Sequence, residues 1–248
     1  MCGRYASVKG PSELAEEFQA VDATDGAAPG ADFNVAPTRP VLAVVQRHPR
    51  DADGTPDPDT TVRSLRVMRW GLIPSWAKDA STGNRLINAR AESAADKPAY
   101  RKALARRRCL LPADGWYEWR AEDGRKQPFF LTRADGGSLA LAGLWEFWRP
   151  EPDAELVFST AVVTTDAVGP LADIHDRMPL VLPPEAWAKW LDPDDTDVAE
   201  LLVPPAETLV AGLELRPVST RVNDVRNEGP DLVDRVEPKP PAQTMLEL

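Results

Sequence analysis

The chain has 248 residues, a formal net charge of -10 and the apolar content of an ordinary folded protein. No apolar run approaches the roughly 18 residues that a membrane helix needs, and the N-terminus lacks a signal-peptide pattern, so we expect a cytoplasmic protein with no membrane contact. Only two cysteines and two histidines are present, far apart, so neither a disulfide framework nor a zinc site is expected. We expect one domain over residues 2–235, a loose C-terminal tail over 236–248, and no metal or cofactor.

The charge is distributed unevenly along the chain. Segment 63–108 carries twelve basic and three acidic residues, so the rest of the chain is strongly acidic. Such asymmetry predicts one basic face on an acidic body, which suits a protein that binds nucleic acid. The alternative is a solvated helix surface, and for the basic helix near 101–108 taken alone we favour that alternative.

The first residue with distinctive chemistry is Cys2. Removal of Met1, which the small Cys side chain favours, leaves an amine and a thiol on adjacent carbons. The amine can condense with an aldehyde to an imine, and the thiol can close on the imine carbon to give a thiazolidine. Both groups titrate near neutrality, at about 8 and about 8.5. The alternative is that Cys2 is an incidental small residue at a frayed terminus.

The next part of the chain predicts a helix over 12–21 and strands over 41–46 and 62–71, the second strand with a basic face. The loop after this strand holds Trp70 and Trp76 beside Gly and Pro. Two exposed tryptophans would be costly, so each either plugs the core or forms a stacking platform, and the sequence favours neither.

Three polar residues, Asn88, Arg90 and Glu92, alternate after an apolar entry. In a strand they would project from one face, which indicates a site more than a core. A basic helix is expected over 98–107. Cys109 follows in an apolar run, so we expect an inert buried thiol there.

Glu118 lies among three aromatic residues in the string GWYEW. We expect it to be partly desolvated, which raises a carboxyl pKa and makes the group a usable general acid or base near neutrality. The alternative is a surface Glu on a strand whose alternate residues are buried. The functional interpretation is favoured only because Cys2 is also present.

The strands expected after Glu118 are separated by short turns, at 123–124 and at 134–137. These turns join strands over 128–133, 139–148 and 155–165. Consecutive hairpins of this kind predict an antiparallel meander that curls toward a barrel.

His175 lies in a loop between acidic and basic neighbours, shortly after Gly169-Pro170. A lone histidine is more often structural than catalytic, but its loop position and charged neighbours favour a titrating role. A helix over 184–191 and a last strand over 213–219 complete the predicted elements.

Six strings in this order and spacing resemble the SRAP (SOS response-associated peptidase) family, the abasic-site shielding proteins of bacteria and eukaryotes. The strings are MCGRYA, FNVAPT, WGLIPSW, INARAE, GWYEW with QPFF after it, and DIHDRMP. The resemblance covers roughly residues 2–227. It implies an α+β fold, a single mixed domain with antiparallel strands in a β-barrel-like core flanked by helices.

The resemblance also implies a function. Mature Cys2 would bond covalently to the ring-opened sugar of an abasic site in single-stranded DNA and shield it from strand cleavage in the DNA damage response. The implied catalytic residues are Cys2, Asn88, Glu118 and His175. The implied DNA contacts are Arg4, Asn34, Trp76, Arg90 and Arg177. Where some members have two adjacent Trp, this chain has Ser75-Trp76, so we expect weaker stacking.

The chemistry expected from the family is crosslinking with lyase-type character, together with removal of Met1 by self-cleavage or by an aminopeptidase. We expect a monomer associated with the nucleoid, and replication-associated proteins are candidate partners. One alternative is a thiol peptidase acting in trans with Cys2 as nucleophile. The other is a non-catalytic module that binds single strands, in which Cys2→Ala would leave all DNA behaviour intact.

Overall fold

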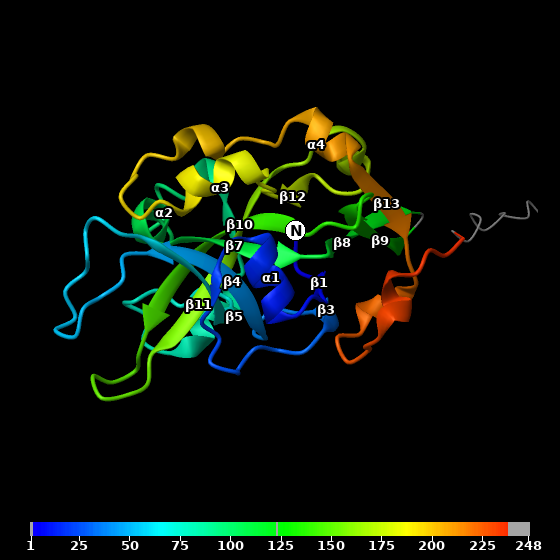
Figure 1. Ribbon diagram of the computed structural model, residues 1–248. Helices are drawn as coiled ribbons and strands as arrows, with labels where there is room; N and C mark the ends of the chain where they lie inside the picture. Colours follow the sequence, from blue (N-terminus) through cyan, green and yellow to red (C-terminus); the bar gives the residue numbers. More distant parts are fainter. Residues whose placement is uncertain (1, 123, 238–248) are drawn as a thin grey trace, which may run out of the picture.

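The computed structural model describes residues 2–122 and 124–237. Strands make up most of the regular structure and short helices lie around them (Figure 1), so the fold is α+β, as expected. The strands are β1 (Tyr5–Ser7), β2 (Val21–Asp22), β3 (Asp32–Val35), β4 (Pro40–Arg47), β5 (Val62–Trp70), β6 (Asn88–Arg90), β7 (Arg108–Ala113), β8 (Gly115–Glu122), β9 (Arg125–Arg133), β10 (Leu139–Trp148), β11 (Val157–Asp166), β12 (Arg177–Pro179) and β13 (Leu213–Pro217). The α-helices are α1 (Pro11–Glu17), α2 (Arg101–Arg106), α3 (Pro184–Leu191) and α4 (Glu207–Ala211).

The strands form two sheets. The smaller has the order β13-β9-β8-β1-β3, and all its pairs are antiparallel. The larger follows the path β12-β11-β10-β7-β4-β5-β2. Strand β11 also pairs in parallel with β5, with Ser159 opposite Arg69. The pairings of β5, β4, β7, β10 and β11 therefore return to the strand where they begin, and we call these five strands the five-strand ring.

Each ring strand sends alternate side chains into two different cores, as the two-residue period of a strand requires. On β4, Val41, Ala43 and Val45 belong to a cluster that joins both sheets. The intervening Leu42 and Val44 belong to a second cluster, which the helices cover. The candidate site lies in the first cluster.

Helices α1, α2 and α3 contribute one or two buried side chains each to the second cluster, among them Leu14, Leu104 and Trp190, whereas α4 places Val210 in the first cluster. Their short lengths give little helical stability of their own, so this packing holds them in place. No helix within the described residues is both long enough and apolar enough to span a bilayer.

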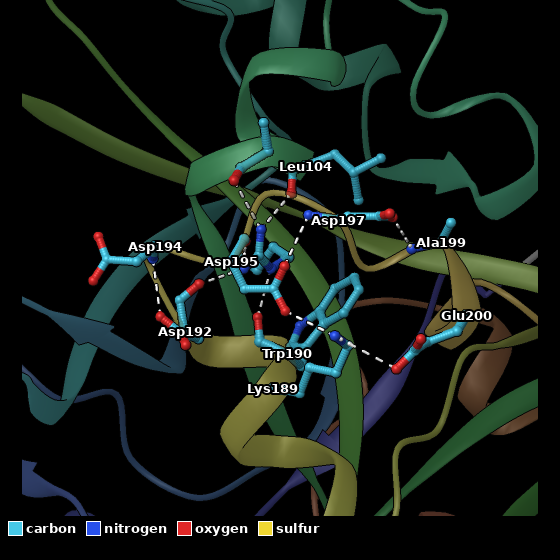
Figure 2. Close-up of polar contacts among 11 residues, drawn as sticks. Leu104, Lys189, Trp190, Asp192, Asp194, Asp195, Asp197, Ala199 and Glu200 are labelled. Atoms are coloured by element: carbon cyan, nitrogen blue, oxygen red, sulfur yellow. Dashed lines mark hydrogen bonds and ion pairs between the residues drawn. The ribbon is translucent and has the colours of Figure 1, made fainter.

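A buried arginine ties α2, β7 and α3 together. Arg108 is 4% exposed, and its guanidinium donates to the carbonyls of Leu104, at 2.7 Å, and of Trp190, at 2.6 Å. It also donates to the carbonyl of Asp195, at 2.7 Å. The Leu104 and Trp190 carbonyls lie in the last turns of α2 and α3, where the backbone lacks intrahelical donors, and Asp195 lies in the loop after α3. Figure 2 shows the same region, with Lys189 reaching the Asp195 carboxylate at 2.8 Å.

Two predicted helices are shorter than expected. The first ends at Glu17, well before residue 21, because Gln19 adopts a φ of 52°, in the left-handed region that cannot continue a right-handed helix. The basic helix expected over 98–107 covers only Arg101–Arg106.

The predicted meander is wrong at one junction. Strand β9 does not pair with β10: it pairs with β8 and β13, and β10 pairs with β7 and β11. The chain turns between them at Gly136, which has a φ of 76°. Strands β7 and β8 are consecutive in the chain but belong to different sheets. Strand β9 pairs with β8 in the smaller sheet, and β10 pairs with β7 in the larger sheet.

The expected strand face over Asn88, Arg90 and Glu92 is wrong for Glu92. The strand ends at Arg90, and Ala91–Ser93 form a 3-10 turn that redirects the Glu92 side chain. Of the expected tail, Val236 still donates its N–H to the carbonyl of Pro217 at 2.9 Å. Residues 238–248, and Asp123 of the expected turn at 123–124, lie outside the described residues.

Candidate functional site

The centre of the candidate site is Cys2, whose side chain is completely buried. Strand β1 begins three residues later, between β3 and β8, with Tyr5 opposite both Val35 and Trp116. This central position carries Cys2 into the core cluster that joins the two sheets. Burial raises the pKa of the Cys2 thiol well above its usual range, and the negative charge of Glu118 acts in the same direction.

Asn88 holds the backbone of Cys2. Its Nδ2 donates to the carbonyl oxygen of Cys2 at 2.8 Å, across 86 positions in the sequence. Strand β6 positions the residue by pairing in parallel with β11, Asn88 opposite Val162, and the hydroxyl of Tyr100 donates to the Asn88 carbonyl at 2.9 Å. The Oδ1 atom of Asn88 is buried and has no hydrogen-bond partner within the described chain, so it can accept from a bound molecule.

Glu118 lies on the same face of β8 as Trp116 and is 3% exposed. Burial raises the pKa of its carboxyl from 4.5 to about 7, so the expected desolvation is confirmed. The charge of Asp176 also raises this pKa, which places the loop of His175 close to Glu118. A carboxyl that is half ionised at neutral pH can both take and give a proton.

His175 follows the 3-10 turn Gly169–Asp173 and donates its backbone N–H to the carbonyl of Leu171 at 3.0 Å. Its Nδ1 accepts from the backbone N–H of Arg177 at 2.9 Å, while Oδ1 of Asp176 lies 2.8 Å from the same atom. One nitrogen cannot accept from the N–H and donate to the carboxylate at once. Burial lowers the pKa of His175 and so favours the neutral ring. In a neutral ring, acceptance of the Arg177 N–H by Nδ1 leaves the proton on Nε2.

The structure therefore brings three of the four expected catalytic residues into direct relation: Asn88 by its hydrogen bond to Cys2 and Glu118 by its charge on the thiol. It places His175 on a loop whose next residue, Asp176, acts on Glu118. Their roles in catalysis stay predictions. Among the described residues, no group of three or more His, Cys, Asp or Glu is arranged to hold a metal ion.

Two of the expected DNA contacts, Arg4 and Asn34, bind one another. Nη1 of Arg4 donates to Oδ1 of Asn34 at 2.7 Å and to the carbonyl of Val222 at 2.8 Å. The Asn34 amide in turn donates to the carbonyls of Asp224, at 3.0 Å, and Asn227, at 2.9 Å. Asn34 is 3% exposed, so in this structure its amide fixes the segment 222–227 to the smaller sheet.

The other three expected DNA contacts differ in exposure. Trp76 is 61% exposed and Arg90 is also exposed. Arg177 is 9% exposed, and its guanidinium forms ion pairs with Asp166, at 2.6 Å, and Glu92, at 2.9 Å. To contact a phosphate, the Arg177 guanidinium must bind it beside these two carboxylates or release one of them.

Residues 1–225 match the family model described as SOS response associated peptidase (SRAP). The chain belongs to the SRAP family. It is 34% identical over 237 residues to the "Abasic site processing protein YoqW" of Bacillus subtilis, covering 94% of this chain and 99% of that protein. It is also 34% identical over 206 residues to the "Abasic site processing protein HMCES" of Gallus gallus, covering 73% of this chain and 60% of that protein.

Two solved structures share the fold of this SRAP chain. A protein from Bacteroides thetaiotaomicron superposes with a TM-score of 0.77 at 22% identity, covering 95% of this chain and all of that one. A protein from Bordetella bronchiseptica gives 0.68 at 27% identity, covering 88% and 100%. At these identities the first comparison supports the fold alone.

Sequence reasoning missed the segment 222–227 of this SRAP chain as part of the site region. Besides binding Arg4 and Asn34, it supplies Asn223, whose Oδ1 accepts from the Trp119 indole at 2.7 Å. The only sequence signal was the polar string from Asn223 to Asn227, which resembles an ordinary surface loop. Its role depends on contacts across more than 100 positions, which no local pattern encodes.

Proposed function

We propose that this SRAP protein captures abasic sites in single-stranded DNA by a covalent bond from Cys2, after Met1 has been removed. The observation that carries the proposal is the buried pair of Cys2 and Glu118, with the carboxyl pKa raised to about 7. The printed names of the bacterial and avian relatives, abasic site processing proteins, support the substrate. A ring-opened abasic sugar presents an aldehyde, the group with which an N-terminal amine condenses.

The proposed reaction uses each group once. Glu118 takes a proton from the Cys2 ammonium, and the free amine adds to the aldehyde carbon. Loss of water from the adduct gives an imine. The Cys2 sulfur then bonds to the imine carbon, the thiol proton passes to the nitrogen, and a thiazolidine ring is complete. No oxidant or reductant is consumed.

Asn88 and His175 have positioning and proton-donating roles in this scheme. Through its hydrogen bond to the Cys2 carbonyl, Asn88 fixes the N-terminal residue, and its free Oδ1 is available to the amine or a sugar hydroxyl. Neutral His175 carries its proton on Nε2, where it can donate to the sugar ring oxygen as the ring opens. Closure to the thiazolidine removes the imine, which otherwise promotes β-elimination, and this explains why the strand would be protected.

Affinity for the strand is proposed to come from Trp76, Arg90 and Arg177, with Arg4 and Asn34 acting through the contacts of the segment 222–227. Phosphate contacts give affinity without reading sequence, which suits a lesion sensor. The β-barrel-like core expected from the family corresponds to the five-strand ring, whose closed set of pairings supports that interpretation.

The test is intact mass spectrometry of the protein before and after mixing with abasic single-stranded oligonucleotide, with and without borohydride. We expect protein that lacks Met1 and a heat-stable adduct that forms without borohydride. Cys2→Ala keeps the amine and should give only an adduct that borohydride traps, with more strand nicking. If Cys2→Ala forms the same heat-stable adduct as the wild type, the thiazolidine mechanism is wrong.

The alternative is a thiol peptidase acting in trans, and the word peptidase in the family description supports it. It predicts turnover of added peptides by the same Cys2 and no stable DNA adduct. Parallel assays with a peptide library and with the abasic oligonucleotide separate the two functions.

A further inference from the structure

The five-strand ring has two ends. One end is closed by Trp70, which packs against Tyr5 with ring centroids 5.2 Å apart and donates to the carbonyl of Ile87, next to Asn88. The other end lies at the far termini of the same strands, since β4 pairs Pro40 with Arg69 at one end and Arg47 with Val62 at the other. Seven residues of extended strand separate these ends by roughly 23 Å.

Arginines and phenylalanines surround this second end. Residues two apart on a strand share one face, so these side chains lie on the same face of the ring as buried residues of the core. Arg66 shares its face with Met68, Arg47 with Val45, and Phe158 with Thr160. Each ring strand, or the residue next to it, supplies one member. We call this set the distal rim, and its members are Arg47, Arg66, Arg107, Phe147 and Phe158.

The distal rim is a stack of cations and rings. The Arg47 guanidinium carbon lies 5.3 Å from the ring centroid of Trp145, and that of Arg107 lies 5.6 Å from Phe147. Trp145 contacts Phe158 with centroids 6.1 Å apart, and Phe158 pairs directly with Phe147 across the strands. Phe147 is 43% exposed and Phe158 is 37% exposed.

Positive charge concentrates at the distal rim. The pKa of Arg47 is lowered by burial and by the charges of Arg107, Arg50 and Arg66, so these three cations lie close enough to act on the Arg47 guanidinium. Arg107 is paired with Glu146 at 2.6 Å. Arg47 and Arg66 have no carboxylate partner in the described part of the chain: Arg47 donates to the Arg106 carbonyl and Arg66 to the Ser64 hydroxyl. On a chain of formal charge -10, such a cluster is a local positive patch that can attract an anionic partner.

Two buried donors at the same end are unsatisfied. Nε1 of Trp145 and Nε of Arg107 have no acceptor among the described residues, and Trp145 is 6% exposed. Buried N–H groups without acceptors are uncommon and costly, so both groups are available to donate to an oxygen of a bound molecule or of water. Arg107 is also held rigidly, because the next residue is the buried Arg108 that anchors α2 and α3.

We propose that the distal rim is a second binding site for single-stranded DNA, separate from the Cys2 site. Exposed rings that stack bases, arginines that contact phosphates and tolerance of any sequence are the features by which proteins hold single strands. The occupant is a stretch of the same strand away from the lesion, or of another strand. The proposal shares with the proposed function only the class of ligand, since it needs neither Cys2 nor an abasic site.

The experiment measures affinity for intact single strands, without lesions, of two lengths. A short oligonucleotide of about 8 nucleotides fills one site, and one several times longer can reach both. We expect the wild type to bind the longer strand much more tightly. In the double variant Arg47→Glu, Arg66→Glu this gain should disappear, and the slope of log affinity against log salt should fall by about 0.7 for each lost contact. Arg101→Glu, at an exposed position on α2, reverses one charge away from the distal rim and should keep the gain.

A second variant guards against misfolding. Phe147→Ala with Phe158→Ala removes two partly exposed rings and no charge, and it should weaken binding of the longer strand by roughly tenfold or more, from a stacking loss of about 1–3 kcal/mol per base. Crosslinking of a short abasic oligonucleotide should be unchanged in all three proteins. The proposal is overturned if the wild type shows no gain with length, if both rim variants retain the gain, or if Arg101→Glu loses it equally. If the wild type shows the gain with strand length but does not crosslink to the abasic oligonucleotide, the proposed function is contradicted and the second binding site is not.

Discussion

The side-chain amide of Asn88 donates to the backbone carbonyl of Cys2 at 2.8 Å, and so connects the start of the chain to strand β6. This bond requires a donor at the amide nitrogen. Asn88→Asp is nearly isosteric but places a carboxylate oxygen against the carbonyl, so we expect it to displace Cys2 and to slow adduct formation by about 10²-fold, a loss typical of misplaced reacting groups.

The measurement for Asn88→Asp is a single-turnover time course on abasic single-stranded DNA. Its control is binding of an intact strand of the same length, which should change by less than a factor of a few. Equal loss of binding and of reaction rate would show that Asn88 acts through DNA affinity and not through Cys2.

In the proposed mechanism, the ionisation of Glu118 sets the pH dependence of the reaction. Burial raises the carboxyl pKa to about 7, and the base form is the reactive one, so the crosslinking rate should rise with pH up to about 7 and then level as Glu118 becomes fully ionised. Glu118→Gln should be slower by about 10²-fold and should lose this inflection. A variant profile that keeps the inflection near 7 would assign it to another group.

The sequence left open whether Trp70 and Trp76 fill the core or form a stacking platform, and the structure places the two differently. Trp70 is completely buried and Trp76 is 61% exposed, so one fills the core and the other is available for stacking. Trp70→Ala should destabilise the protein by about 3–5 kcal/mol. Trp76→Ala should leave the melting temperature within a degree or two and weaken binding of single strands. Thermal unfolding and DNA titration of both variants check the pair, and unchanged DNA affinity in Trp76→Ala would remove its DNA role.

The same two tryptophans illustrate what the sequence could predict. The positions of the longer strands, such as β5, β10 and β11, followed from local patterns, and the desolvation of Glu118 followed from its aromatic neighbours, because both depend on residues close in sequence. Strands β1, β3 and β7 were not predicted. The burial of one Trp and the exposure of the other depend on whether the chain places Tyr5 against the ring, a contact across 65 positions. The separation of β9 from β10 and the junction of Asn34 with the segment 222–227 are also long-range, and no local pattern encodes them.

Comparing Ala variants of Arg90 and Arg177 distinguishes a residue that only contacts DNA from one that also stabilises the fold. Arg90 is exposed, whereas Arg177 is paired with Asp166 and Glu92 and is 9% exposed. Both Ala variants should lower affinity for single strands regardless of sequence. Only Arg177→Ala should also lower the melting temperature, since it leaves the Thr164 carbonyl and two carboxylates without their donor. Differential scanning fluorimetry beside fluorescence anisotropy distinguishes the cases, and full affinity in Arg90→Ala would exclude it from the DNA interface.

Glu118 should also leave a signature in protein stability. Its pKa is raised from 4.5 to about 7 in the folded chain, so between these values the folded state binds more protons than the unfolded state. Stability from this group is therefore fully present below pH 4.5 and is lost as pH rises through 7. The loss approaches about 3 kcal/mol, from a shift of roughly two and a half units at 1.36 kcal/mol each.

Glu118→Gln has no carboxyl to ionise and should escape this loss. We expect its free energy of unfolding, relative to the wild type, to rise by up to about 3 kcal/mol between pH 4.5 and pH 8, while its reaction rate falls. Urea unfolding at a series of pH values measures the difference, and Glu13→Gln, on exposed helix α1, is the control that should show no such rise. Parallel stability curves for the wild type and Glu118→Gln would mean that the carboxyl is solvated in solution, and the proton acceptor for Cys2 would then have to be sought elsewhere.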